Sequence, residues 1–143
     1  MRKKIIVPDA SVLLKWAFKT HEEDYSDKAL LLLESWLGGE VEIVLPGLWC
    51  YEVGNVLMLK SPELAPDLME VFLSYDFQVQ EMTLELCRVA FSIMRKSRVT
   101  FYDAVYHAVA ILHEGTLLTA DEAYARKVAE VDHVTVLKDL PFF

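Results

Sequence analysis

Hydrophobic and polar positions follow two different spacings along the chain. Short apolar or alternating runs at 5–7, 41–45, 77–81, 116–119 and 134–137 predict β-strands. Apolar residues three or four positions apart predict helices over 11–18, 22–37, 48–60, 66–75, 83–96, 100–114 and 121–130. Strands that alternate with helices indicate the α/β class, and we predict a three-layer α/β/α sandwich around a largely parallel sheet with right-handed crossovers.

Composition limits the possible classes of protein. The 143 residues correspond to one domain, which we expect to span 1–143 without an internal repeat or a linker. Hydrophobic residues make up 54% of the chain and the mean hydropathy is +0.26, but the apolar runs are too short to cross a membrane. Cys50 and Cys87 have no second Cys or His at ligand spacing, so a disulfide framework and a zinc site are both excluded. We therefore expect a cytoplasmic protein.

The charge balance at first argues against a nucleic-acid partner. Fourteen Lys and Arg residues face 22 Asp and Glu residues, which gives a formal net charge of −8. Proteins that grip nucleic acid by neutralising phosphates carry a basic surface. This chain lacks the composition for that mode of binding.

Polar side chains gather where the predicted strands pass into helices. In open α/β sheets ligands bind beyond the carboxyl ends of the strands, so these turns are the first place to look for a site. The turns and the helices that follow them contain four carboxylates together with two hydroxyls and an amide: Asp9, Glu52, Asp103 and Asp121, with Ser11, Asn55 and Thr119.

Each carboxylate also has a purely structural explanation. Asp9 and Asp121 stand where helix N-caps are expected, and the stretch from Thr100 to Asp103 has the spacing of a capping box. Glu52 lies among apolar residues, where an unpaired carboxylate is costly to bury, and a neighbouring Arg or Lys would be a structural partner for it.

The four carboxylates together are more informative than each alone. If they lie at one end of one sheet with few cations nearby, they repel one another unless a cation lies among them. Oxygen-only ligands suit Mg²⁺ or Mn²⁺. Such an ion can activate water and neutralise charge on a phosphate substrate.

At this point the sequence resembles a known family. Four segments look like the four motifs of the PIN domain, and the likeness is greatest to VapC-type toxins of prokaryotic toxin–antitoxin pairs. The segments are Asp9-Ala-Ser-Val, Tyr51-Glu-Val-Gly-Asn55-Val-Leu, Phe101-Tyr-Asp103-Ala-Val-Tyr-His-Ala-Val-Ala and Leu118-Thr-Ala-Asp121. The motifs run from the first predicted strand to near the end of the chain, so the resemblance implies a PIN-like fold throughout.

The resemblance implies a Mg²⁺- or Mn²⁺-dependent endoribonuclease that forms a homodimer and is inhibited by a small antitoxin protein. The acidic quartet would be Asp9, Glu52, Asp103 and Asp121, with Ser11, Asn55 and Thr119 in support. Asp9 and Asp103 are the expected direct metal ligands, while Glu52 and Asp121 act directly or through water. The apolar stripe at 29–37 and the tail 140–143 offer surfaces for dimer or antitoxin contacts, although core packing also explains the stripe.

Two further features have two explanations each. Arg95, Lys96 and Arg98 precede Asp103 and suit an approaching RNA backbone, but a solvated helix C-terminus accounts for them equally well. His107 lies one helical turn beyond Asp103, and we interpret it as a packing residue rather than a catalytic one.

Other enzyme classes fit less well. A dehalogenase-like phosphatase needs a second Asp where Ser11 stands, and a dinucleotide-binding protein needs glycines in the first turn. The remaining alternative is a PIN-like module that has kept its acidic pocket but only binds RNA or a partner protein.

Overall fold

The sheet is built around the N-terminal strand. The structure is a computed structural model that describes residues 2–18 and 25–140. Within these ranges five parallel strands lie in the order β3-β2-β1-β4-β5. Ile6 pairs with Ile43 of β2, and Val7 pairs with Leu117 of β4, so β1 is the central strand. The strands are β1 (Lys4–Pro8), β2 (Val41–Pro46), β3 (Gln78–Gln80), β4 (Thr116–Thr119) and β5 (Val134–Val136).

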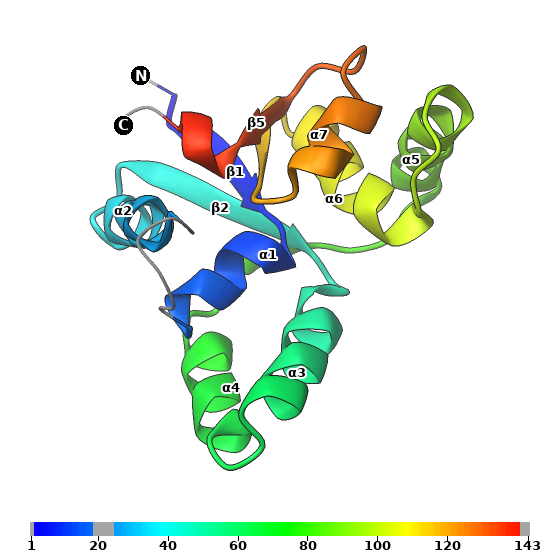
Figure 1. Ribbon diagram of the computed structural model, residues 1–143. Helices are drawn as coiled ribbons and strands as arrows, with labels where there is room; N and C mark the ends of the chain where they lie inside the picture. The colour runs from blue at the N-terminus through cyan, green and yellow to red at the C-terminus, as the bar shows by residue number, and fades with distance from the viewer. Residues whose placement is uncertain (1, 19–24, 141–143) are drawn as a thin grey trace.

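Helices cover both faces of this sheet. Helix α2 packs on β2, while α6 packs on β1, β2 and β4, and Figure 1 shows α2 and α6 on opposite sides of the strands. Helix α5 in turn packs against α6. This arrangement confirms the predicted α/β/α sandwich. The helices are α1 (Ala10–Leu13), η1 (Leu14–Trp16), α2 (Ser26–Leu37), α3 (Trp49–Lys60), α4 (Ala65–Ser74), α5 (Leu84–Lys96), α6 (Phe101–Leu112), α7 (Glu122–Lys127) and η3 (Leu137–Asp139).

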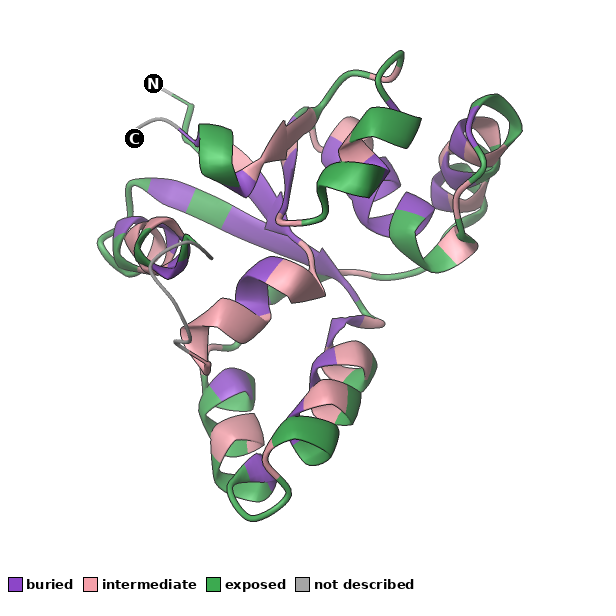
Figure 2. Ribbon diagram, in the orientation of Figure 1, coloured by how far each residue is buried: buried purple, intermediate pink, exposed green. Residues whose placement is uncertain are grey.

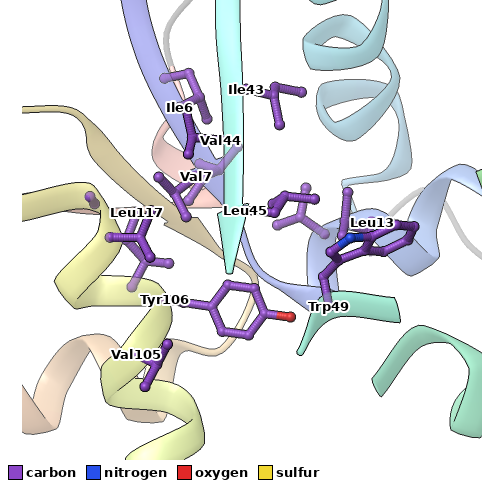
Figure 3. Close-up of a cluster of buried hydrophobic side chains, with 14 of the residues drawn as sticks. Ile6, Val7, Leu13, Ile43, Val44, Leu45, Trp49, Val105, Tyr106 and Leu117 are labelled. Carbon is purple, nitrogen blue, oxygen red and sulfur yellow. The ribbon is translucent and has the colours of Figure 1, made fainter. Parts of the chain in front are cut away.

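The core is formed by the central strands and the inner face of α6. Residues 43–46 of β2 and 104–110 of α6 are buried, whereas the outer faces of α3, α4 and α5 are exposed (Figure 2). Buried side chains from β1, β2, α1, α3 and α6 meet near the carboxyl ends of the strands (Figure 3). The burial of this apolar surface therefore anchors the same edge of the sheet from which the acidic side chains extend.

A second packing unit, which we call the aromatic cluster, joins η1, α2, α3 and α4. Trp16 stacks on Trp36 and on Phe72, with ring centroids 6.5 and 6.3 Å apart. Trp49, one turn before Glu52, packs against Phe77 at 5.0 Å. Because aromatic pairs of this kind add stability beyond simple burial, the cluster fixes the first turn of α3. Its members are Trp16, Trp36, Trp49, Phe72, Tyr75 and Phe77.

The ends of several helices differ from the prediction. The helix expected at 11–18 is a single α-helical turn followed by the 3₁₀ helix η1, and the helix expected to reach 130 ends at Lys127. The first three residues of the helix predicted over 22–37 and the end of the tail, at 141–143, lie outside the described residues. The apolar stripe at 29–37 mostly packs inward, since Ala29 and Leu32 are fully buried, although Leu37 at its end is exposed.

Gly115 lies where the chain passes close to β1. The helix predicted to reach residue 114 ends at Leu112 of α6, and Glu114 takes a positive φ of 54°. A Cβ atom on Gly115 would lie 2.6 Å from the carbonyl oxygen of Ile5. Glycine therefore allows the chain entering β4 to approach β1 closely.

Cys50 and Cys87 are free thiols. In the described ranges, helices of the length and apolar character needed to cross a bilayer are absent.

Candidate active site

Asp9 stands directly after β1 and caps helix α1. Its Oδ1 accepts hydrogen bonds from the backbone N–H of Ser11, at 3.0 Å, and from the Ser11 hydroxyl. Burial raises the pKa of Asp9 from 3.8 to about 6, against the opposing effect of hydrogen bonds from Ser11 and Thr119. The structural prediction of an N-cap is thus confirmed, and the carboxylate is also held in surroundings that disfavour its charge.

Asp121 occupies the equivalent turn after β4 and caps α7. Its Oδ1 accepts a hydrogen bond from the Tyr124 N–H, and its own N–H donates to the Thr119 hydroxyl, both at 3.0 Å. The Ser11 hydroxyl accepts a hydrogen bond from the Ala120 N–H at 3.0 Å. Ser11 and Thr119 therefore tie the turn after β4 to the turn after β1, which brings Asp9 and Asp121 to one edge of the sheet.

Glu52 extends from the first turn of α3, and none of the described residues gives it a basic partner. Its Oε1 is buried, and so is the hydroxyl of Tyr106 from α6, yet neither completes a hydrogen bond of normal geometry with any described residue. Figure 3 shows the Tyr106 ring beside the end of β2 with its oxygen directed toward the start of α3. The pKa of Glu52 is raised by burial and by the charges of Asp103 and Asp9, while proximity to the Tyr106 hydroxyl lowers it.

Asp103 enters from the first turn of α6. Its N–H donates to the Thr100 hydroxyl at 3.2 Å, which is one half of the predicted capping box. Although the residue is exposed, partial burial of its carboxylate and the charge of Asp121 raise its pKa, and Lys127 lowers it. Asp103 and Asp121 line a cavity of about 310 Å³ together with Arg98, Thr100, Tyr124 and Lys127.

The structure thus brings the four predicted carboxylates within electrostatic reach of one another. The charges of Asp9 and Asp103 raise the pKa of Glu52, and the charge of Asp121 raises the pKa of Asp103. We call the space that they surround the acidic pocket. No three acidic, His or Cys side chains in the described part of the chain lie close enough to form a ready-made metal cage. A cation would have to draw these carboxylates together or bind some of them through water.

Of the other predicted site residues, one lines the cavity beside the acidic pocket and others do not. Asn55 lies one turn beyond Glu52 on α3 and is exposed. Of the basic residues, Arg98 lines the cavity beside Asp103, whereas Lys96 lines a separate apolar groove between α5 and α6. Arg95 is exposed in the last turn of α5.

His107 is fully buried and packs between α6 and α7. Its Nδ1 lies 2.9 Å from the Tyr124 hydroxyl, and its Nε2 lies 2.7 Å from the carbonyl oxygen of Asp132. Burial lowers its pKa, and the hydrogen bond to Asp132 acts in the opposite direction. The interpretation of His107 as a packing residue agrees with this environment.

Three residues at the pocket were missed by sequence reasoning. Tyr106 follows Asp103 by three positions, and Tyr124 follows Asp121 by three, so helical spacing could have placed both beside the acids. Lys127 lies one further turn along α7, and its charge acts on Asp103. The buried rings of Tyr106 and Tyr124 look like core residues in a hydrophobicity pattern, which hides their polar ends.

Comparison with known proteins finds a family model that matches most of the chain. The family model described as "PIN domain" matches residues 6–130. The comparison with curated protein sequences found no match.

Solved structures of similar fold cover nearly the whole chain. A toxin–antitoxin complex from Klebsiella pneumoniae has 16% sequence identity and a TM-score of 0.69, covering 94% of this chain and 99% of the other. VapBC2 from Rickettsia felis, bound to a promoter DNA fragment, has 13% identity and a TM-score of 0.68, with 92% and 96% coverage. The sarcin–ricin-loop-cleaving toxin VapC20 from Mycobacterium tuberculosis has 16% identity and a TM-score of 0.63, with 85% and 93% coverage. At these identities the likeness establishes a shared fold.

Proposed function

The chain belongs to the PIN domain family, and on that premise we propose that it is a metal-dependent endoribonuclease that hydrolyses RNA phosphodiester bonds at the acidic pocket. We further propose that it is the toxin of a toxin–antitoxin pair. Solved structures that share its fold are described as toxin–antitoxin complexes or as an RNA-loop-cleaving toxin, which supports both statements.

The observation that carries the proposal is the gathering of four carboxylates around one pocket, where neighbouring charges raise the pKa of two of them. Glu52 Oε1 is buried near the Tyr106 hydroxyl rather than beside a cation, and burial together with neighbouring acids raises the pKa of Glu52 and Asp103. A protein that only needed caps at these positions would gain nothing by placing carboxylates against one another. The donor set consists of oxygens, as Mg²⁺ and Mn²⁺ require.

The residues therefore fit a divalent cation. Asp9 and Asp103 would hold it directly, with Glu52 and Asp121 acting directly or through water. Once bound, such an ion supplies Lewis-acid activation of water and neutralises charge on the phosphate. Ser11 and Thr119 keep Asp9 and the Asp121 turn in position through the hydrogen bonds described above.

RNA binding is assigned to the basic residues that line the cavity. Arg98 and Lys127 flank Asp103 and Asp121, so they can bind the phosphates on either side of the one that is cleaved. Arg95 and Lys96 precede Arg98 and do not line the cavity, so they would contact RNA only outside the pocket. Binding is then centred on one short stretch of RNA, in keeping with a chain of net charge −8.

The proposed protein partners are a small antitoxin and a second copy of this chain, with the complex residing in the cytoplasm. An acidic pocket attracts a basic segment of an inhibitor for the same electrostatic reason that it attracts a cation. Exposed apolar side chains on α3 and α4, including Leu59 and Leu73, offer surface for such contacts.

The test is cleavage of a mixed-sequence oligoribonucleotide pool and of ribosomal RNA by the purified chain with Mn²⁺. We expect wild type to cleave, EDTA to stop cleavage, and Asp9→Asn and Asp103→Asn to abolish it without unfolding the protein. The matched control is Asp67→Asn, because Asp67 is exposed in the first turn of α4, away from the pocket. If wild type binds Mn²⁺ and RNA but leaves the RNA intact, the chain is instead the binding module that was the alternative.

A further inference from the structure

His107 and Tyr124 form a hydrogen-bonded pair behind the acidic pocket. His107 is 0% exposed and Tyr124 is 5% exposed, so bulk water does not compete for the hydrogen bond between them. The pair joins α6, which carries Asp103, to α7, which Asp121 caps. Nothing in the roles assigned above to the four carboxylates requires either side chain.

The contacts of His107 determine where its proton lies. A backbone carbonyl oxygen can only accept a hydrogen bond, so Nε2, which lies 2.7 Å from the Asp132 oxygen, must carry a hydrogen. A buried imidazole without a carboxylate contact is neutral, in agreement with its lowered pKa, and a neutral ring has one protonated nitrogen. Nδ1 is therefore an acceptor, and the Tyr124 hydroxyl, 2.9 Å away, must donate to it.

This assignment determines what Tyr124 offers to the pocket. Its ring lines the cavity beside Asp103 and Asp121, and the charges of Asp103 and Asp9 act on its hydroxyl. A phenol beside carboxylates would ordinarily donate its hydrogen to one of them. Because that hydrogen is directed to His107, the lone pairs of the phenol oxygen are left to accept a hydrogen bond.

We propose that His107 positions the Tyr124 hydroxyl as a hydrogen-bond acceptor toward the acidic pocket, where it orients the water molecule that attacks the RNA phosphodiester. A water that donates one hydrogen to Tyr124 and the other to a carboxylate such as Asp103 directs its lone pair toward the phosphorus. The inference rests on the proposed nuclease function. Tyr124 and His107 are positioning residues: the attacking water contacts Tyr124, and His107 acts only through it.

Three variants separate this role from simple packing. Tyr124→Phe keeps the ring and removes the hydroxyl. His107→Asn places an amide oxygen near the position of Nδ1 and so keeps an acceptor for Tyr124, whereas His107→Gln reaches the position of Nε2 and keeps only the donor. We expect Tyr124→Phe and His107→Gln to lower kcat for RNA cleavage about tenfold with unchanged KM, and His107→Asn to retain most of the activity.

A second readout needs neither metal nor RNA. In wild-type protein the ¹⁵N resonances of the His107 ring should show Nε2 protonated and Nδ1 unprotonated at neutral pH. A protonated Nδ1 overturns the inference. So does a set of kcat values that follows the thermal stability of the variants rather than the presence of an acceptor for Tyr124.

The outcomes also distinguish this inference from the proposed function. If wild type cleaves RNA and Tyr124→Phe cleaves equally fast, only the positioning role fails. If wild type cleaves no RNA with Mn²⁺, the nuclease function fails and the role of Tyr124 in water attack fails with it.

Discussion

Replacing Asp9 by asparagine should stabilise the metal-free protein. The carboxylate of Asp9 is surrounded by protein and by other acids, so its charge is unfavourable in the folded state and harmless in the unfolded chain. Asparagine is neutral, is equally suited to an N-cap, and can still accept the hydrogen bond from the Ser11 N–H. The substitution therefore removes the charge and keeps the local structure.

The magnitude follows from the pKa of Asp9. Folding raises it from 3.8 to about 6, and one pKa unit corresponds to about 1.4 kcal/mol, so the ionised carboxylate destabilises the folded state by about 3 kcal/mol. At pH 7.5 we expect Asp9→Asn to raise the free energy of unfolding by about 1 to 3 kcal/mol. The upper value assumes that asparagine fits without rearrangement.

The pH dependence has a definite sign. Well below pH 3.8 Asp9 is protonated in both states and its charge has no effect on stability. As the pH rises from about 4 to about 6, the unfolded chain loses this proton before the folded protein does, so the wild-type contribution to stability falls. The difference in the free energy of unfolding between Asp9→Asn and wild type should therefore grow from about pH 4 to about pH 6 and stay constant above pH 6.

The assay is urea unfolding followed by far-UV circular dichroism in EDTA, from pH 4 to pH 8. Asp67→Asn is the control, and its difference from wild type in the free energy of unfolding should not grow between pH 4 and pH 6. Mn²⁺ at 100 times its dissociation constant should stabilise wild type by about 2.7 kcal/mol and Asp9→Asn by less. If Asp9→Asn is no more stable than wild type at pH 7.5 in EDTA, Asp9 does not carry the unfavourable charge that the acidic pocket requires.

Three other changes have equally definite expected results. Gly115→Ala should lower the free energy of unfolding by about 2 to 3 kcal/mol in urea titrations, because the new methyl group meets a backbone carbonyl, and an unchanged value would contradict that close approach. Phe72→Ala should lower it by about 3 to 5 kcal/mol, since the ring is 2% exposed in the aromatic cluster, and a loss below 1 kcal/mol would contradict its role there. Arg98→Ala and Lys127→Ala should each weaken RNA binding in filter assays and reduce the slope of log affinity against log salt by about one, while Lys96→Ala should not. Equal effects of all three would show that RNA is not centred on the cavity.

The sequence predicted the sites that depend on local chemistry. Asp9 and Asp121 follow strands directly, and the carboxyl ends of parallel strands must share one edge, so their proximity could be inferred before any coordinates. Glu52 was identifiable because a carboxylate among apolar residues needs a reason to be there.

The residues that escaped prediction depend on tertiary packing. Whether the rings of Tyr106 and Tyr124 end in the core or at the pocket depends on how α6 and α7 are rotated, which no periodicity determines. The same holds for Lys127, which acts on Asp103 of another helix. The helix ends at 13 and 127 were missed because local spacing continues past the point where contacts with the sheet stop.

The aromatic cluster also gives this protein a built-in optical reporter. All three tryptophans of the chain belong to it, and they lie on the side of the sheet edge that carries α3 and Glu52. The opposite side, formed by α6, β4 and α7, contributes no tryptophan. Intrinsic fluorescence therefore reports selectively on the packing of the aromatic cluster, which holds the first turn of α3 and Glu52 in place. Circular dichroism reports on all helices. A fluorescence transition that precedes the dichroic one would reveal that the acidic pocket opens on its α3 side before the sheet unfolds.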